Sequence, residues 1–289
     1  MKKLLGILVL GLLLIPTLAM SGTFKDDGDF GLKAKSRSGF KIHVNYFGQG
    51  NDHNFKYIKD ENKARAGKYF QRFELRDGDC WGSEGGWNDC KNDRERFEFS
   101  ARPTQLPMNI KCYGYSLMLS KDFIDVHPTN TDLGQVHQKG GPTGTAGGLA
   151  SFPPLIQIDA RQGYLFFNWH ELSGSATNVI DESRYHRLKP LKDMKEVWTD
   201  ISFCLDFKNK GMDVWVDGIK KVEILKSPIF FKPKSIYFKH GIYRSFISRY
   251  KQRNNGKMPT QIVFYDEIRR GKSIEKVDIN INPKLKPVD

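Results

Sequence analysis

The sequence predicts an all-β protein, a sandwich or barrel of antiparallel strands, and three observations support this. Short runs alternate apolar and polar side chains along most of the chain, which is the period of a half-buried strand. Turn-forming pieces rich in Gly, Asn and Asp separate these runs. No long stretch places apolar residues at helical spacing.

The expected strands follow one another in order, each bounded by turn signals. An early alternating run, Phe40 to Phe47, ends at the turn-rich Gly48 to Asp52. A loop over residues 77–93 carries two tryptophans, and residues 140–148 form a glycine-rich loop. Residues 187–196 are expected to be irregular and basic. The remaining strands are expected at residues 68–76, 94–102, 112–119, 132–139, 154–162, 163–170, 197–207, 212–216, 236–246 and 260–269, with one more after the Asp217-Gly218 turn.

The first residues have the pattern of a secretory signal. A basic start, Lys2 and Lys3, precedes the apolar run Leu4 to Leu14, and Pro16 and small residues follow. We place the signal at residues 1–21 and one domain at residues 22–289. The apolar run is short for a membrane span, so a retained anchor is the weaker alternative. The expected location is secreted or periplasmic, without membrane attachment once the signal is removed.

The formal net charge is +13 and the isoelectric point is about 9.4. For an exported protein this balance favours attraction to polyanions. Nucleic acid and acidic polysaccharide both fit, and charge alone does not choose between them.

The chain has four cysteines, an even number that suggests two disulfides in an exported protein. Cys80 with Cys90 would close the tryptophan-rich loop, and Cys112 with Cys204 would tie distant strands. Spacing does not decide the connectivity, and a zinc site is a weaker alternative. None of the four lies near a plausible catalytic partner, which argues against a thiol nucleophile.

The stretch Ile236 to Ser245 is the most informative one. Read as a strand, it places Tyr237, Lys239, Gly241 and Tyr243 on one face. The opposite face, which includes Phe238, His240 and Ile242, suits a core. A glycine inside a strand often admits another chain or a ligand. A phenol beside a fixed cation is a plausible proton-transfer group, because positive charge stabilises phenolate.

Two earlier stretches share this design. Arg72, Glu74 and Arg76 alternate with apolar Phe73 and Leu75. Gln135 and His137 lie on one face of their strand, with Val136 behind them. If the three strands are neighbours, their polar faces form one surface suited to an acidic substrate and proton transfer.

These three segments resemble motifs of the β-jelly-roll polysaccharide lyases, which include alginate lyases and the heparin lyase I and glucuronan lyase relatives. Alginate lyases of that fold show an Arg-x-Glu-x-Arg strand, a Gln-Ile/Val-His strand and a Tyr-Phe-Lys-Ala-Gly-x-Tyr strand. Here His240 replaces the usual alanine and Arg244 follows Tyr243. Residues 260–269 also look like those relatives. The resemblance covers roughly residues 68–272 and implies a concanavalin-like sandwich with a concave substrate groove.

The resemblance implies β-elimination at a uronic acid: removal of the C5 proton, then cleavage of the C4–O bond. Arg72 and Gln135 would bind the sugar carboxylate, and Lys239 would face the substrate. His137 would act as the base or polarise the site. Tyr243 would donate a proton to the leaving oxygen and, with some sugar epimers, would also remove the C5 proton. Arg76 would contact substrate or pair with Glu74, which we place in the same substrate-binding group.

Two other functions fit the same scaffold. A non-catalytic carbohydrate-binding protein would not need the pair His137 and Tyr243. A glycoside hydrolase needs two carboxylates across the scissile bond, and no closely spaced set is evident. Trp81 and Trp87 would stack on sugar rings or only cover the disulfide loop.

The resemblance implies no required cofactor and an anionic polysaccharide as the partner, with no nucleic acid, and we expect a monomer. Some relatives bind a structural calcium ion. Here Asp125, Asp132, Asp159 and Asp266 would supply it, although no calcium-loop pattern is present. Further basic residues favour a highly charged glycan, without deciding whether it is sulfated.

Overall fold

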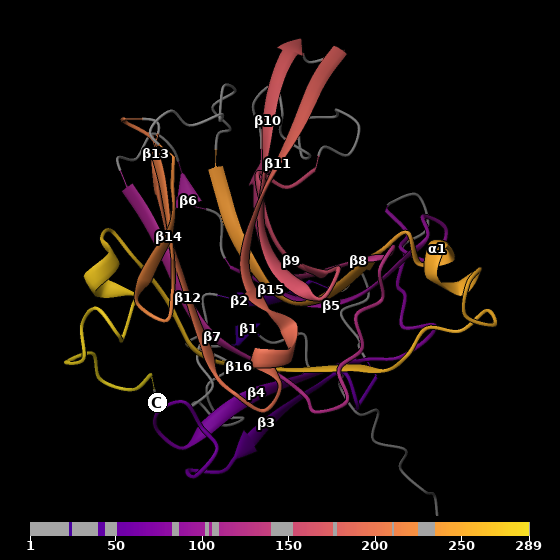
Figure 1. Ribbon diagram of the computed structural model, residues 1–289, viewed down its shortest axis with the longest axis horizontal. Helices are drawn as coiled ribbons and strands as arrows, with labels where there is room; N and C mark the ends of the chain where they lie inside the picture. The colour runs from indigo at the N-terminus through magenta and orange to yellow at the C-terminus, as the bar shows by residue number, and fades with distance from the viewer. Residues whose placement is uncertain are drawn as a thin grey trace, which may run out of the picture.

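The computed structural model describes residues 23–24, 40–43, 51–82, 87–101, 104–105, 110–139, 153–175, 178–209, 211–224 and 235–288. Within them, two antiparallel β-sheets pack face to face (Figure 1). The signal segment and the glycine-rich loop over residues 140–148 lie outside the described residues. No described helix is long and apolar enough to cross a membrane.

The nine-stranded sheet has the order β1-β2-β5-β15-β8-β9-β10-β11, with β6 paired to β15. In Figure 1 its long strand β15 bends along its length, so the sheet is curved. Its strands are β1 (Thr23–Phe24), β2 (Phe40–His43), β5 (Arg94–Ala101), β6 (Thr104–Gln105), β8 (Asn130–Lys139), β9 (Ile156–Arg161), β10 (Tyr164–Ser175), β11 (Asn178–Pro190) and β15 (Ser235–Ser245).

The seven-stranded sheet has the order β14-β13-β12-β7-β16-β4-β3. Its strands are β3 (Phe55–Lys59), β4 (Tyr69–Leu75), β7 (Ile110–Leu119), β12 (Thr199–Asp206), β13 (Gly211–Val216), β14 (Ile219–Ile224) and β16 (Gln261–Gly271). The described helices are short: α1 (Ile247–Lys251) and the 3₁₀ turns η2 (Leu191–Met194) and η3 (Ile274–Lys276). The prediction of an all-β sandwich is confirmed.

Alternation along the strands builds the core between the sheets. Phe73 on β4, Phe99 on β5 and Phe238 on β15 are all fully buried. In each of these strands the residues on either side of the inward phenylalanine are polar and point to the other face, as in half-buried strands. The core is therefore rich in aromatic rings, with centroids of Phe73 and Phe99 5.2 Å apart.

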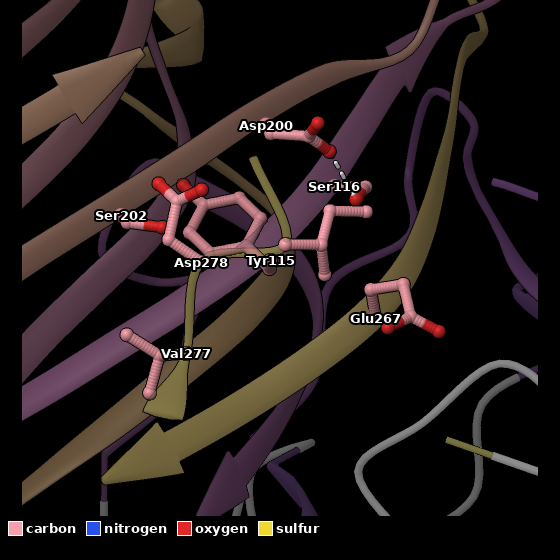
Figure 2. Close-up of a pocket in the computed structure, with 8 residues that line it drawn as sticks. Tyr115, Ser116, Asp200, Ser202, Glu267, Val277 and Asp278 are labelled. Atoms are coloured by element: carbon pink, nitrogen blue, oxygen red, sulfur yellow. Dashed lines mark hydrogen bonds between the residues drawn. The ribbon is translucent and has the colours of Figure 1, made fainter. Parts of the chain in front are cut away.

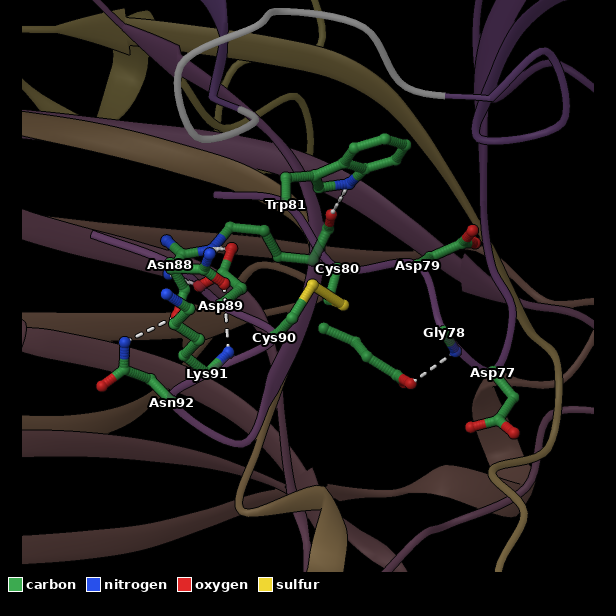
Figure 3. The surroundings of a disulfide bond; sticks show 12 residues. Asp77, Gly78, Asp79, Cys80, Trp81, Asn88, Asp89, Cys90, Lys91 and Asn92 are labelled. Carbon is green, nitrogen blue, oxygen red and sulfur yellow. Dashed lines mark hydrogen bonds and ion pairs between the residues drawn. A yellow bond between two sulfur atoms is a disulfide. The ribbon is translucent and has the colours of Figure 1, made fainter. Parts of the chain in front are cut away.

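Both expected disulfides are present. Cys112 and Cys204 are directly opposite each other on β7 and β12, so the bridge links two paired strands. Cys80 and Cys90 close the loop before β5, with Cα atoms 5.0 Å apart (Figure 3). The described chain has no free cysteine, so the alternative that these cysteines bind zinc is wrong.

One expectation about secondary structure is wrong. Residues 187–196 are not irregular throughout, because β11 continues to Pro190 and η2 follows it. β11 pairs with β10 in a long hairpin that projects beyond the other strands in Figure 1. Polar and charged residues together occupy most of β11, so it lacks the apolar alternation that marks a strand in sequence.

Candidate active site

The central strand of the candidate site is β15, which lies between β5 and β8. Phe238, His240 and Ile242 are buried in the core, as expected. His240 contacts Gln71 of β4, with Nε2 and Oε1 2.8 Å apart, and takes no part in the site. Tyr237, Lys239 and Tyr243 point the other way. We call this outward side of the nine-stranded sheet the site face.

Gly241 does not leave a gap for a ligand. A Cβ atom at this position would lie 2.3 Å from the carbonyl oxygen of Phe97 and 2.8 Å from Cα of Glu98. Its φ of +132° is also one that side chains rarely allow. The glycine therefore admits the backbone of the neighbouring strand β5.

β8 brings Gln135 and His137 beside β15, as the sequence suggested. Gln135 is opposite Lys239, and His137 is opposite Tyr237. The His137 ring stacks on Tyr237, with centroids 5.6 Å apart and planes within 9°. Two of the three predicted polar strands are thus neighbours.

The third predicted strand is elsewhere, and the prediction that it borders the other two is wrong. Arg72 and Glu74 lie on β4, which belongs to the seven-stranded sheet and pairs with β3 and β16. Arg72 and Arg76 both bind the Glu74 carboxylate. Because β4 buries Phe73 and Leu75 against the core, its polar face is on the opposite side of the sandwich from the site face.

β5 supplies the arginines instead. It pairs with β15, and its register places Arg96 opposite Tyr243 and Glu98 opposite Gly241. Arg94, Arg96 and Glu98 share the site face, because Phe97 and Phe99 point into the core. Sequence reasoning missed these residues, although β5 shows the same signal as β4: charged side chains that alternate with apolar ones.

Glu98 connects the other polar side chains of the site. Its Oε1 accepts a hydrogen bond from Gln135 Nε2 at 2.6 Å, and its Oε2 accepts one from Lys239 Nζ at 2.9 Å. Arg96 lies 3.6 Å from the same carboxylate. The four side chains are all buried, so each holds the others in one geometry.

Tyr243 is surrounded by cations. Its hydroxyl oxygen accepts a hydrogen bond from Arg94 Nε at 3.0 Å. The Arg96 guanidinium lies 4.3 Å from the ring centroid, and Lys239 Nζ lies 5.8 Å from it. This arrangement can stabilise negative charge on, or near, the phenol oxygen.

The disulfide loop fixes Arg96 from behind. Asp89, next to Cys90, is fully buried and accepts a 2.7 Å hydrogen bond from Arg96 Nε (Figure 3). Trp81 donates to the Arg96 carbonyl oxygen at 3.1 Å, and Trp87 donates to Asp89 at 2.7 Å. Trp81 is thus part of the support of Arg96, whereas Trp87 keeps 39% of its surface exposed.

The environments of Tyr243 and His137 shift their pKa values in opposite directions. Burial raises the pKa of Tyr243 above its ordinary value, and the charges of Arg96 and Arg94 offset only part of that rise. The expectation that a nearby cation eases deprotonation is outweighed by burial in the free protein. Burial, together with the charge of Lys239, lowers the pKa of His137 to about 3. Near neutral pH the phenol is a proton donor and the imidazole an acceptor.

The four aspartates considered for calcium do not come together. Asp132 and Asp159 are opposite each other on β8 and β9. Asp125 accepts a hydrogen bond from the Gly163 amide, and Asp266 lies on β16 in the other sheet. Among the described residues, no group of three or more acidic, histidine or cysteine side chains is arranged to hold a metal ion.

A small acidic pocket lies on the seven-stranded sheet, lined by residues that include Asp200, Glu267 and Asp278 (Figure 2). Its volume is about 10 Å³, which is room for about one water molecule. Ser116 donates a 2.5 Å hydrogen bond to Asp200 within it. A sugar ring does not fit this pocket, so we place the candidate site on the other sheet.

The sequence matches the profile of the polysaccharide lyase family over residues 35–269. This chain belongs to that family. The lyase has the β-jelly-roll sandwich that its motifs suggested, and the assignment as an enzyme rests on this match. No curated protein matches its sequence.

The fold is similar to that of a solved structure. The endo-β-1,4-glucuronan lyase from the fungus Trichoderma reesei superposes with a TM-score of 0.58 at 14% identity, covering 82% of this chain and 97% of that chain. Alginate lyase AlyC3 gives 0.49 at 14% identity, covering 78% and 80%. Alginate lyase AlgAT5 of polysaccharide lyase family 7 gives 0.48 at 13% identity, covering 78% and 85%.

Proposed function

We propose that this lyase is exported and cleaves an anionic polysaccharide at a uronic acid by β-elimination. The observation that carries the proposal is the Tyr243 side chain, whose hydroxyl Arg94 binds directly and whose ring lies near Arg96 and Lys239. A phenol held by cations supplies a proton donor and stabilises negative charge, and removal of a proton next to a carboxylate needs both. The motifs of β8 and β15, and glucuronan as the polymer named for the fungal lyase, support the same substrate class.

Arg94 favours a carboxylate ligand. Of the three cations near Tyr243, Arg96 pairs with Asp89 and Lys239 pairs with Glu98, whereas Arg94 binds the phenol oxygen. The C5 proton is very weakly acidic while the neighbouring carboxylate keeps its charge. Arg94 and Gln135 would stabilise the enolate-like charge that forms when C5 loses its proton. Because the groups are prearranged, little reorganisation accompanies the reaction.

Protonation states assign the roles. Tyr243, whose pKa is raised, donates its proton to the leaving O4. His137, neutral because its pKa is lowered to about 3, accepts the C5 proton. β8 separates His137 from Asp132, the residue opposite Tyr243, by five positions, roughly 16 Å of extended strand. The two side chains therefore act on one sugar only if they converge above Gln135 and Lys239.

The direct test offers the purified protein a panel of uronate polymers and follows the ultraviolet absorbance of the new C4–C5 double bond. A rise in absorbance that parallels loss of polymer length supports β-elimination. Polymer binding without any absorbance change would favour the alternative, a non-catalytic carbohydrate-binding protein.

Arg94 and Arg72 provide a matched pair. We expect Arg94→Ala to lower kcat/KM roughly 10²-fold, because it removes a hydrogen bond to the reacting phenol. Arg72→Ala removes the same charge on the other sheet, where Arg76 still binds Glu74, and should change kcat/KM by less than about twofold. Steady-state kinetics on the best polymer measures both. The reverse ranking would return the carboxylate-binding role to β4.

His137→Ala tests the assignment of the base. We expect a loss of roughly 10²-fold in kcat, at the low end for general base catalysis, because an imidazole with so low a pKa is a weak base. The measurement is kcat at saturating polymer, with circular dichroism to verify folding. If His137→Ala keeps most of its activity while Tyr243→Phe does not, Tyr243 serves as both base and acid.

Export is consistent with two disulfides in the mature region. We propose that residues 1–21 are removed and that residues 22–289 act as one domain. N-terminal sequencing of the protein recovered outside the cytoplasm would locate the cleavage point.

A further inference from the structure

One line of residues crosses the site face through six strands in register. Starting from β5, Arg96 is opposite Tyr243, which is opposite Asp132. Asp132 is opposite Asp159 on β9. The line ends on Phe166 of β10 and Arg187 of β11. Its charge is positive at Arg96, negative at the two aspartates and positive again at Arg187.

The two aspartates lie beside the reacting phenol. Asp132 and Asp159 are 1% and 2% exposed, and each has an Oδ1 atom without a hydrogen-bond partner in the described structure. Asp132 Oδ2 accepts from Gln157 at 2.7 Å, and Asp159 Oδ2 lies 3.2 Å from Arg161 Nε. Each carboxyl therefore keeps one polar atom that the protein does not satisfy.

Burial and the charge of Asp159 raise the pKa of Asp132, and burial raises that of Asp159 to about 7. Near neutral pH the pair therefore retains a proton and a residual negative charge. Arg161, which pairs with Asp159, offsets that charge, so this part of the face offers a sugar carboxylate no excess of positive charge. An uncharged sugar needs none.

The far end of the line, on β9 to β11, again carries cations. Arg187 is exposed, and its guanidinium lies 4.1 Å from the Tyr164 ring centroid. Arg161 lies 3.8 Å from the centroid of Tyr185, which is 45% exposed. Stacking holds both guanidinium groups flat. Arg161 also pairs with Asp159, whereas Arg187 is exposed and can bind an anion.

A pocket of about 360 Å³ adjoins this cluster. Tyr164, the ring under Arg187, lines it together with Leu191, Lys192 and Lys195. Its size is in the range of small-molecule sites, and its two lysines outnumber the one carboxylate that lines it, Asp125. Anion-binding chemistry is therefore repeated four strands from Tyr243, roughly 19 Å away across the sheet.

We propose that the site face selects an acidic heteropolysaccharide, in which a neutral sugar separates the cleaved uronate from the next anionic unit. The neutral sugar lies over Asp132 and Asp159, and a later anionic unit binds Arg187. A homopolymer would place a carboxylate over the aspartates. This inference rests on the proposed function, since it names the substrate class of the same site.

The test compares unsulfated polymers that share glucuronate as the cleaved sugar. Glucuronan is a homopolymer, whereas hyaluronan and unsulfated chondroitin alternate glucuronate with a neutral acetylated amino sugar. We expect kcat/KM on the better alternating polymer to exceed that on glucuronan by about tenfold or more. Glucuronan cleaved equally well or better would overturn the inference and leave the lyase function intact. No ultraviolet product from any polymer would count against the proposed function itself.

Two variants test the charge line. Asp159→Asn keeps the shape and removes the charge, so the preference for the alternating polymer should fall about threefold or more. Arg187→Ala should raise KM for long chains about threefold or more while kcat stays nearly constant. Arg184→Ala, an exposed arginine on the same strand but on its opposite face, is the matched control and should change neither value. Unchanged polymer preference in Asp159→Asn, or equal KM values in the two arginine variants, would contradict the assignment.

Discussion

Replacing Tyr243 by phenylalanine should lower kcat by roughly 10³–10⁴-fold, at the upper end for loss of a general acid. The variant removes the hydroxyl that Arg94 binds and leaves the ring over Arg96 in place. It therefore keeps the packing of β15 against β5 while it removes the proton that the leaving oxygen needs. The ultraviolet assay at saturating polymer measures kcat, and thermal unfolding verifies that stability is retained.

Tyr237→Phe is the matched control for this experiment. Tyr237 lies on the same strand and the same face, where its ring stacks on His137. Removing its hydroxyl should cost at most about tenfold, because it is not within the arginine cluster. Equal losses in the two variants would mean that Tyr243 has no special place in the chemistry, and the proposed mechanism would be wrong.

Replacing Gly241 by alanine should destabilise the protein by about 3 kcal/mol or more. The added Cβ would lie 2.3 Å from a backbone oxygen of β5, and a backbone atom cannot move aside as a flexible side chain can. The φ of +132° adds strain. Chemical denaturation gives the free energy of unfolding. Activity should fall as well, because Glu98, the residue opposite Gly241, holds Gln135 and Lys239.

Gly163→Ala separates the steric clash from the backbone strain. Gly163 also has a positive φ, +76°, but nothing lies within 4 Å of a Cβ built there. The Gly163→Ala substitution should lower the free energy of unfolding by only about 1 kcal/mol, the strain of a left-handed backbone. If Gly241→Ala is no worse than Gly163→Ala, the strands β5 and β15 are not as close as the structure shows.

Most of β15 and β8 was predictable from sequence. Alternation assigned Lys239 and Tyr243 to one face and Phe238 and Ile242 to the core, and the structure agrees. The same rule placed Gln135 and His137 on a common face. It works because successive side chains of a strand point to opposite faces, whichever sheet the strand joins.

The choice of arginine strand was not predictable in this way. β4 and β5 both alternate charged and aromatic residues, and Phe73 of β4 lies in the same core as Phe97 and Phe99 of β5. A two-sheet sandwich has two outward faces, and alternation does not distinguish them. Only pairing decides: β5 bonds to β15, whereas β4 bonds to β3 and β16.

The sequence by itself determined that this protein is an all-β sandwich, that its cysteines are suited to two disulfides, and which side of each strand is polar. These properties depend on local period and composition. The tertiary structure decided which polar sides meet. It brought Arg94, Arg96 and Glu98 to Tyr243, moved Arg72 to the opposite sheet, and aligned Asp132 and Asp159 with both arginine clusters. Strand order and register arise from packing between segments far apart in the chain, and no local pattern contains that information.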